Sequence, residues 1–114
     1  MVHIDISVED GINVLMINGD VDASSSIQLD DALKKTMESG AIKIIIDCEH
    51  LNYISSAGLG VFMSYIEDIN TKGIHMALYG LNDKVMNVFE ILGLDQLLNI
   101  VSNKKEAIGK ISEA

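Results

Sequence analysis

The stretch Ile42–Gly60 decides the fold, and it reads IKIIIDCEHLNYISSAGLG. Its first part, Ile42–Asp47, is a short β-branched run, which is typical of a strand buried on both faces. A polar segment follows, and Ser55–Gly58 then supplies the small and capping residues with which a helix begins. We therefore expect a buried strand, a polar loop, and a helix that starts at two adjacent serines.

On the amino-terminal side of this stretch, the pattern predicts a hairpin and then a helix. Apolar and polar residues alternate along Val2–Val8, as in a half-buried strand. Asp10-Gly11 is a favourable two-residue turn, so Ile12–Ile17 is expected to return as the second strand. Gly19–Ser24 is rich in turn and capping residues, and the apolar spacing along Ile27–Met37 then predicts a core-facing helix.

On the carboxyl-terminal side, helices and strands continue to alternate. Apolar residues at helical spacing run along Leu59–Ile69, and Ile74–Tyr79 reads as another buried strand. Asn82 is placed to cap a third helix. Leu97–Val101 can form a last short strand, and Asn103–Ile111 a final helix.

This order of elements predicts an α/β fold. Repeated strand–helix–strand units favour a largely parallel sheet, and the leading hairpin makes the sheet mixed. We expect a single domain over residues 1–114, with about four or five strands and about four helices. The single cysteine, Cys48, excludes an internal disulfide and is expected to be a small apolar packing residue rather than a nucleophile. The sequence shows neither a secretory signal nor an apolar run long enough to span a membrane, so we expect a cytoplasmic protein.

The charge balance narrows the classes of function. The formal net charge is −9, all eight basic residues are lysines, and arginine is absent. Such a chain is a poor candidate for binding nucleic acid, and it lacks the arginine clamps common in phosphoryl-transfer enzymes. Gly58 and Gly60 are not followed by the Gly-Lys-Ser/Thr of a P-loop. A close approach of the helix to the sheet, or of a partner to the helix start, is expected at these glycines instead. We therefore expect no enzyme activity, no cofactor and no metal site, and a partner protein with a basic surface.

Ser55 and Ser56 allow two interpretations. Either serine can be an ordinary helix cap, which contributes about 1 kcal/mol. Alternatively, a phosphate on one of them would place close to two negative charges beside the positive end of the helix dipole. The fold would tolerate that dianion, whereas a protein bound at the same place would not. The residues alone leave both interpretations open.

Several segments resemble one known family. Ile44–Asp47 and then Leu51–Val61 look like the signature of STAS domains, which occur in anti-sigma factor antagonists and in the tails of sulfate transporters. Gly19–Ser24 is similar to the family's glycine-x-hydrophobic-aspartate turn before the first helix. Gly80–Val88 and Leu92–Leu94 match its last third. The resemblance implies the same order of strands and helices as the pattern does.

The resemblance also implies a mechanism called partner switching. The unmodified antagonist binds an anti-sigma factor that is also a serine kinase, and the sigma factor is thereby released. The kinase then phosphorylates the antagonist, and a serine phosphatase resets it. Matched residue by residue, the acceptor is Ser56. Ser55 stands where family members often have an aspartate and is the alternative acceptor, and the family's aspartate before the first helix is Asp22.

We therefore predict an anti-sigma factor antagonist that is phosphorylated on Ser56. The resemblance and the position of the helix start assign the partner-binding surface to Asp22, Ser24, Ser55, Gly58 and Leu59. The protein is expected to be a monomer or weak dimer without direct contact to nucleic acid or membrane. Two alternatives remain: a STAS subunit that scaffolds a larger regulatory assembly, and a partner-switching module that controls something other than a sigma factor.

Overall fold

The amino-terminal hairpin forms as the pattern predicts. The computed structural model describes residues 2–112, and its first two strands, β1 (Val2–Glu9) and β2 (Ile12–Val21), pair antiparallel. Asp10 and Gly11 join them with φ angles of 51° and 78°. Two consecutive residues with positive φ make a type I′ turn, whose twist matches that of the strands it connects.

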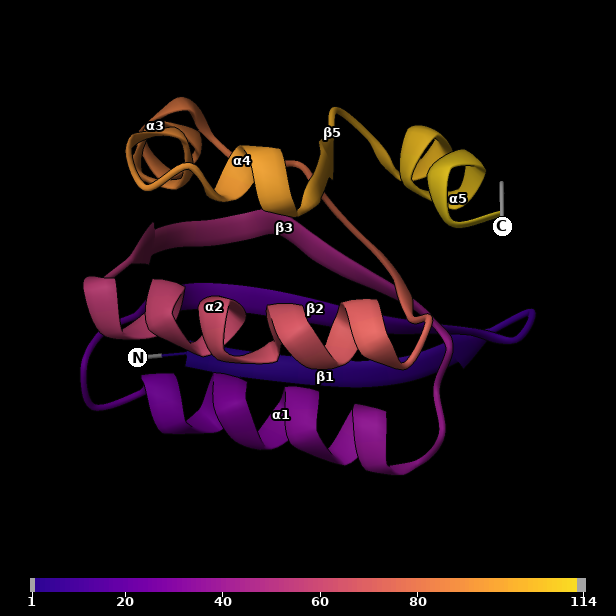
Figure 1. Cartoon of the computed structure of the whole chain (residues 1–114). Coiled ribbons are helices and arrows are strands. Elements are labelled where there is room, and N and C mark those ends of the chain that lie inside the picture. Colours follow the sequence, from indigo (N-terminus) through magenta and orange to yellow (C-terminus); the bar gives the residue numbers. More distant parts are fainter. Residues whose placement is uncertain (1, 113–114) are drawn as a thin grey trace.

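Three further strands extend the hairpin into one mixed sheet. β3 (Lys43–Ile54), β4 (His75–Tyr79) and β5 (Asn99–Val101) run parallel to β2, and the strand order is β1-β2-β3-β4-β5. The predicted α/β fold with a mixed sheet is therefore confirmed (Figure 1).

Among the described residues, five helices pack on this sheet, one more than the pattern predicts. They are α1 (Ser26–Glu38), α2 (Ser56–Thr71), α3 (Asp83–Ile91), α4 (Leu94–Leu97) and α5 (Lys104–Ser112). The additional helix, α4, is a single turn of four residues before β5, too short for an apolar period to be visible. The predicted cap of α3 is confirmed, because the Asn82 side chain accepts a hydrogen bond of 2.8 Å from the backbone N–H of Val85.

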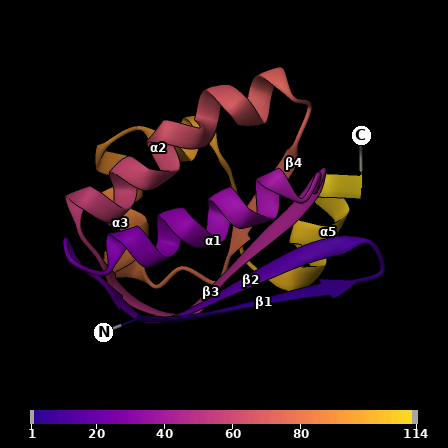
Figure 2. The ribbon, with the colours of Figure 1, turned by 90° about the horizontal axis from the view of Figure 1, so that it is seen from below.

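The two faces of the sheet are covered differently. Ile44 and Ile46 of β3 belong to the main core, which α1, α2 and α3 also line. Ile45 between them belongs to a smaller cluster with residues of α5. Neighbouring residues of a strand point to opposite faces, so α5 covers the second face, and no other helix within residues 2–112 contributes to that cluster. α1 and α2 lie side by side on the first (Figures 1 and 2).

The strand β3 is longer than predicted. The expected strand ended at Asp47 and was followed by a loop, whereas β3 continues to Ile54. The second half pairs with β2 from Asn18 to Val21, with register shifts on the way. Its exposed polar residues hide the strand in the sequence. The consequence is functional: β3 leads directly into the start of α2, with only Ser55 between them.

Within residues 2–112, no helix is both long and apolar enough to cross a membrane.

Candidate functional site

The two serines at the start of α2 have different roles. Ser55 is the N-cap: its backbone is extended, and its Oγ accepts a hydrogen bond of 3.3 Å from the N–H of Gly58. Its own N–H donates to the carbonyl oxygen of Val21 at 2.8 Å. Ser55 is therefore held on both sides, and for this serine the capping interpretation is confirmed.

Ser56 is the first residue of the helix and remains available. Its side chain is exposed, and its hydroxyl takes part in none of the hydrogen bonds found among residues 2–112. The first turn of α2 carries no acidic residue. The positive end of this helix dipole is therefore not neutralised by a carboxylate of its own first turn.

Gly58 and Leu59 hold the helix start against the sheet. A Cβ atom on Gly58 would lie 2.7 Å from Cγ1 of Ile54 and 2.8 Å from Cγ1 of Val21, which is closer than packed atoms approach. The predicted close approach of helix and sheet is thus confirmed at Gly58. Leu59 is 1% exposed, so both residues shape the site from beneath and present no side chain on its surface.

At Gly60 the same explanation is wrong. A Cβ atom there would meet nothing within 4 Å. Gly60 lies one turn after Ser56. Because it has no side chain, no side chain projects from α2 at this position next to the serine. A close approach by a partner protein remains the prediction for this glycine.

The loop before α1 contains a strongly bonded aspartate. Oδ1 of Asp22 accepts hydrogen bonds from the backbone N–H of Ser25 at 2.8 Å, from the Ser25 hydroxyl at 2.8 Å and from the Ser24 hydroxyl at 2.9 Å. These bonds, the backbone N–H first, lower the pKa of Asp22 to about 2. Asp22 is therefore a carboxylate at every physiological pH.

The sheet brings this loop to the start of α2. Val21 and Ile54 are paired residues at the ends of β2 and β3, and Asp22 and Ser55 directly follow them. A surface hollow of about 460 Å³ opens beside the loop, and Asp22, Ser24 and Ser25 contribute to its wall. Three of the predicted site residues, Asp22, Ser24 and Ser55, therefore belong to two adjoining segments at one edge of the sheet.

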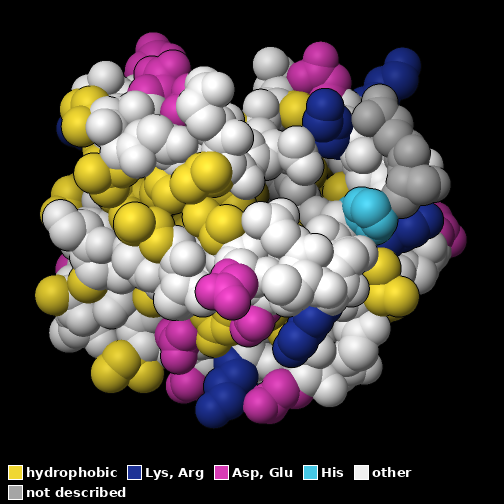
Figure 3. Space-filling model, viewed as in Figure 1, with side chains coloured by type: hydrophobic (Ala, Val, Ile, Leu, Met, Phe, Trp, Pro, Cys, Tyr) yellow, Lys and Arg dark blue, Asp and Glu magenta, His cyan; other side chains and the backbone are white. Residues whose placement is uncertain are grey.

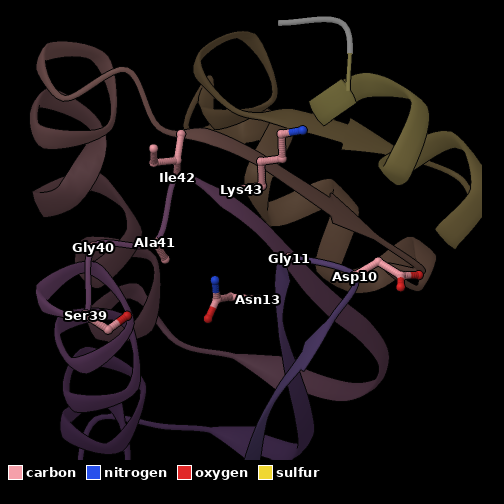
Figure 4. Close-up of a pocket in the computed structure, with 8 residues that line it drawn as sticks. All are labelled: Asp10, Gly11, Asn13, Ser39, Gly40, Ala41, Ile42 and Lys43. Atoms are coloured by element: carbon pink, nitrogen blue, oxygen red, sulfur yellow. The ribbon is translucent and has the colours of Figure 1, made fainter.

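A second, larger hollow lies elsewhere. It has a volume of about 530 Å³ and is lined by the hairpin turn, the end of α1 and the start of β3 (Figure 4). Ser56 follows the other end of β3. This hollow is therefore separate from the predicted site.

Cys48 lies in the interior. It is 0% exposed, and burial, followed by the nearby charge of Asp47, raises the pKa of its thiol. A buried thiol that stays protonated is a poor nucleophile. Its predicted role as a small packing residue is confirmed.

Comparison with known proteins decides the family. The model of the STAS domain matches residues 3–107. The chain belongs to the STAS domain family.

Similar STAS proteins include regulators of sigma factors. The anti-sigma-B factor antagonist of Listeria monocytogenes is 28% identical over 95 residues, which cover 83% of each chain. An anti-sigma factor antagonist from Mycobacterium paratuberculosis shares the fold with a TM-score of 0.90 at 15% identity, over 98% of this chain and 95% of that one. The Bacillus cell fate determinant SpoIIAA, in its phosphorylated form, shares the fold with a TM-score of 0.70 at 20% identity. That match covers 97% of this chain and 99% of SpoIIAA.

This STAS domain also exposes apolar side chains that the sequence pattern did not single out. Ile27, expected on the core-facing stripe of its helix, is 65% exposed and helps to line the hollow beside Asp22. The expectation was wrong because Leu29, Leu33 and their neighbours already fill the core, which leaves Ile27 at the edge of the apolar stripe. Tyr53, just before the two serines, is 49% exposed.

Further apolar residues are exposed along α2 and beyond it. Met63 of α2, two turns after Ser56, is 50% exposed, and Leu92 and Leu97 near α3 and α4 are 48% and 60% exposed. Figure 3 shows hydrophobic side chains gathered on the surface between α2 and the α3–α4 segment. Isolated exposed apolar residues are ordinary, whereas a gathered set marks an interaction surface. A sequence cannot reveal it, because it joins helices far apart in the chain.

Proposed function

We propose that this STAS domain is an anti-sigma factor antagonist that acts by partner switching. In its unmodified form it binds an anti-sigma factor that is also a serine kinase, and the sigma factor is released. Phosphorylation of Ser56 by that kinase ends the binding, and a serine phosphatase restores it. The similar proteins named above support the regulatory role, and the geometry of the α2 start supports Ser56 as the switch.

The observation that carries this proposal is the division of roles between the two serines. Ser55 caps the helix, so modification of its hydroxyl would remove a bond that the fold uses. Ser56 is exposed at the first helical position, and its hydroxyl has no role in packing. A kinase can therefore modify Ser56 without any cost to the structure of the domain.

The electrostatics of the site explain how such a modification can act as a switch. A phosphate at Ser56 would lie at the positive end of α2, which favours an anion. On the surface, the same dianion would join Asp22, which is already ionised, on a chain of net charge −9. A bound partner that had desolvated this surface would face an added charge that it cannot hydrate. The fold therefore persists while the binding is lost.

The docking surface combines these polar groups with apolar contacts. We assign Asp22, Ser24 and Ser55 to it as surface groups, and Gly58 and Leu59 as residues that position the helix. The apolar contacts come from two exposed side chains: Ile27 in the hollow beside Asp22, and Tyr53 two residues before Ser55. Binding energy at protein interfaces concentrates in a few such apolar residues.

Mapping of the phosphate tests the proposal. The protein and its Ser56→Ala, Ser55→Ala and Ser64→Ala variants are incubated with the cognate kinase and ATP and then analysed by mass spectrometry. Ser64 is the matched control, since it is another exposed serine of α2. We expect one phosphate on Ser56 in every form except Ser56→Ala, which should bind the kinase and remain unmodified. A phosphate on another residue of the unmutated protein would refute the assignment.

A further inference from the structure

One edge of the sheet is open along its whole length. β1 is the first strand in the order and has a partner only on the β2 side, and Figure 2 shows it along the outer margin of the molecule. All eight of its residues continue the register with β2 without a shift. Edge strands are usually protected by charged side chains (lysine above all), proline or a bulge. β1 has no lysine, proline or bulge, and its two carboxylates, Asp5 and Glu9, both lie on its polar face.

The backbone of β1 offers regular hydrogen-bonding groups to a second strand. Glu9 and Ile12 flank the two-residue turn and are a register pair, so they form the hydrogen-bonded pair that closes the hairpin. Such pairs alternate along an antiparallel ladder. The N–H and C=O groups of the even-numbered residues, Val2 to Val8, are therefore directed away from β2 and toward the open edge.

The side chains of these same residues form an apolar row that the domain covers only in part. Val2 is buried and Ile4 is partly buried, whereas Ile6 is 43% and Val8 is 67% exposed. His3, Asp5, Ser7 and Glu9 alternate with them on the other face of the strand. An added strand would therefore have to be apolar on one face and polar on the other.

β1 itself meets this description in one antiparallel register. With Ile6 opposite Ile6 of a second copy, Ile4 lies opposite Val8, so apolar residues meet apolar residues. On the other face, His3 lies opposite Glu9, and Asp5 lies opposite Ser7. Opposed residues of this kind stabilise a strand pair, whereas opposed like charges destabilise it.

The neighbouring registers are worse. In the register centred on Asp5, the aspartates of the two copies face each other. In the register centred on Ser7, Asp5 of one copy faces Glu9 of the other. Of these three registers, the one centred on Ile6 is the one that avoids opposed like charges.

We propose that two copies of this protein associate through antiparallel pairing of their β1 strands about a two-fold axis at Ile6, so that the two five-stranded sheets become one continuous sheet. The association ends at the dimer, because the other edge strand that the sheet shows within residues 2–112, β5, has only three residues. Ser56 itself remains free in each copy, since β3, which leads to it, is separated from β1 by β2. The dimer therefore leaves the acceptor serine uncovered.

Disulfide trapping tests the register. In an antiparallel hydrogen-bonded pair the two Cα atoms lie about 5.5 Å apart, within the reach of a disulfide. Ile6→Cys should therefore form a covalent dimer on mild oxidation. Val8→Cys is the matched control: both positions are exposed on the same face, but the two thiols introduced by Val8→Cys would be displaced by about 13 Å along the strand. The native Cys48 is fully buried and does not interfere.

Sedimentation equilibrium tests the association itself, in about 0.15 M salt so that the charge of −9 on each copy is screened. We expect a monomer–dimer equilibrium. Ile6→Lys, which opposes two lysines at the axis, should raise the dissociation constant about tenfold or more. Ser7→Lys, which faces Asp5 of the second copy, should lower it. Circular dichroism shows whether each variant keeps its fold.

Three outcomes would overturn the proposal. They are a monomer at every concentration, a dimer that Ile6→Lys leaves unchanged, and equal trapping of Ile6→Cys and Val8→Cys. If the protein is a monomer at every concentration, the open edge of β1 would instead be a site for a strand of another protein.

Discussion

The starts of α1 and α2 adjoin one another, yet their serines are used in opposite ways. At α1, the hydroxyl of Ser24 and that of Ser25 both donate to Asp22, and the Ser26 hydroxyl donates to the carbonyl oxygen of Ala23. At α2, Ser55 is engaged and Ser56 is not. Of five serines around one site, four are committed to the local structure. The difference identifies which hydroxyl a kinase can modify without disturbing the domain.

The largest difference expected from mutation concerns the third residue after the N-cap of each helix, which is Ser55 in α2 and Ser25 in α1. Gly58→Ala would force a Cβ into Ile54 and Val21 and should lower the free energy of unfolding by about 1–3 kcal/mol. At the corresponding position of α1, Gln28 is exposed, and Gln28→Ala should change it by no more than about 0.5 kcal/mol. Urea denaturation measures both.

Gly60→Ala is the control within α2. Because a Cβ at Gly60 has open space, this change should stabilise the helix by about 0.5–1 kcal/mol. If Gly58→Ala proved as harmless as Gly60→Ala, the close contact of α2 with the sheet would be wrong.

The next effect concerns binding at the α1 start. Truncation of the exposed Ile27 to alanine should weaken the affinity for the anti-sigma factor about tenfold, because it removes an apolar contact beside Asp22. Ile42→Ala is the control, since Ile42 is 58% exposed but lines the separate hollow. Isothermal titration calorimetry distinguishes them. Equal losses for the two variants would remove Ile27 from the docking surface.

A smaller effect separates the two serines in the absence of any partner. Ser55→Ala removes the cap of α2 and should cost about 1 kcal/mol of unfolding free energy. Ser56→Ala should change it by less than about 0.5 kcal/mol, because its hydroxyl contributes no bond to the fold. A larger loss for Ser56→Ala, measured by urea denaturation, would reverse the roles given to these residues.

The smallest effect is the pH dependence that Asp22 contributes. Its pKa falls from 3.8 to about 2 on folding, so its ionised form stabilises the native state above pH 3.8, and this stabilisation is lost as the pH falls toward 2. The stability difference between the protein and Asp22→Asn should therefore narrow as the pH is lowered through this range. A difference that stays constant in thermal unfolding from pH 5 to pH 2 would contradict the bonds from Ser24 and Ser25.

The sequence predicts the elements of this domain well and their surfaces less well. Alternation in β1, the turn at Asp10-Gly11 and the cap at Asn82 each depend on a few neighbouring residues, and all three are confirmed. The second half of β3 was missed because it is stabilised by pairing with β2, a contact between residues distant in the sequence. The exposure of Ile27 was missed for a similar reason, since it depends on how much core the neighbouring elements fill.

In the candidate site, too, local sequence could not determine the role of a single residue. Both serines have the side chain of a cap, and a shift of the helix start by one position would exchange their roles. The extended backbone of Ser55 and its bond to Val21 determine where α2 begins. Those features depend on the pairing of β2 and β3, which the local sequence does not contain.

The most direct test of the switch compares two forms of one protein. The affinity of the anti-sigma factor kinase is measured by calorimetry for the unmodified domain and for the domain phosphorylated on Ser56, with circular dichroism to show that both remain folded. We predict that the phosphate weakens binding roughly 100-fold or more while the fold is unchanged. Equal affinities for the two folded forms would contradict a switch at Ser56.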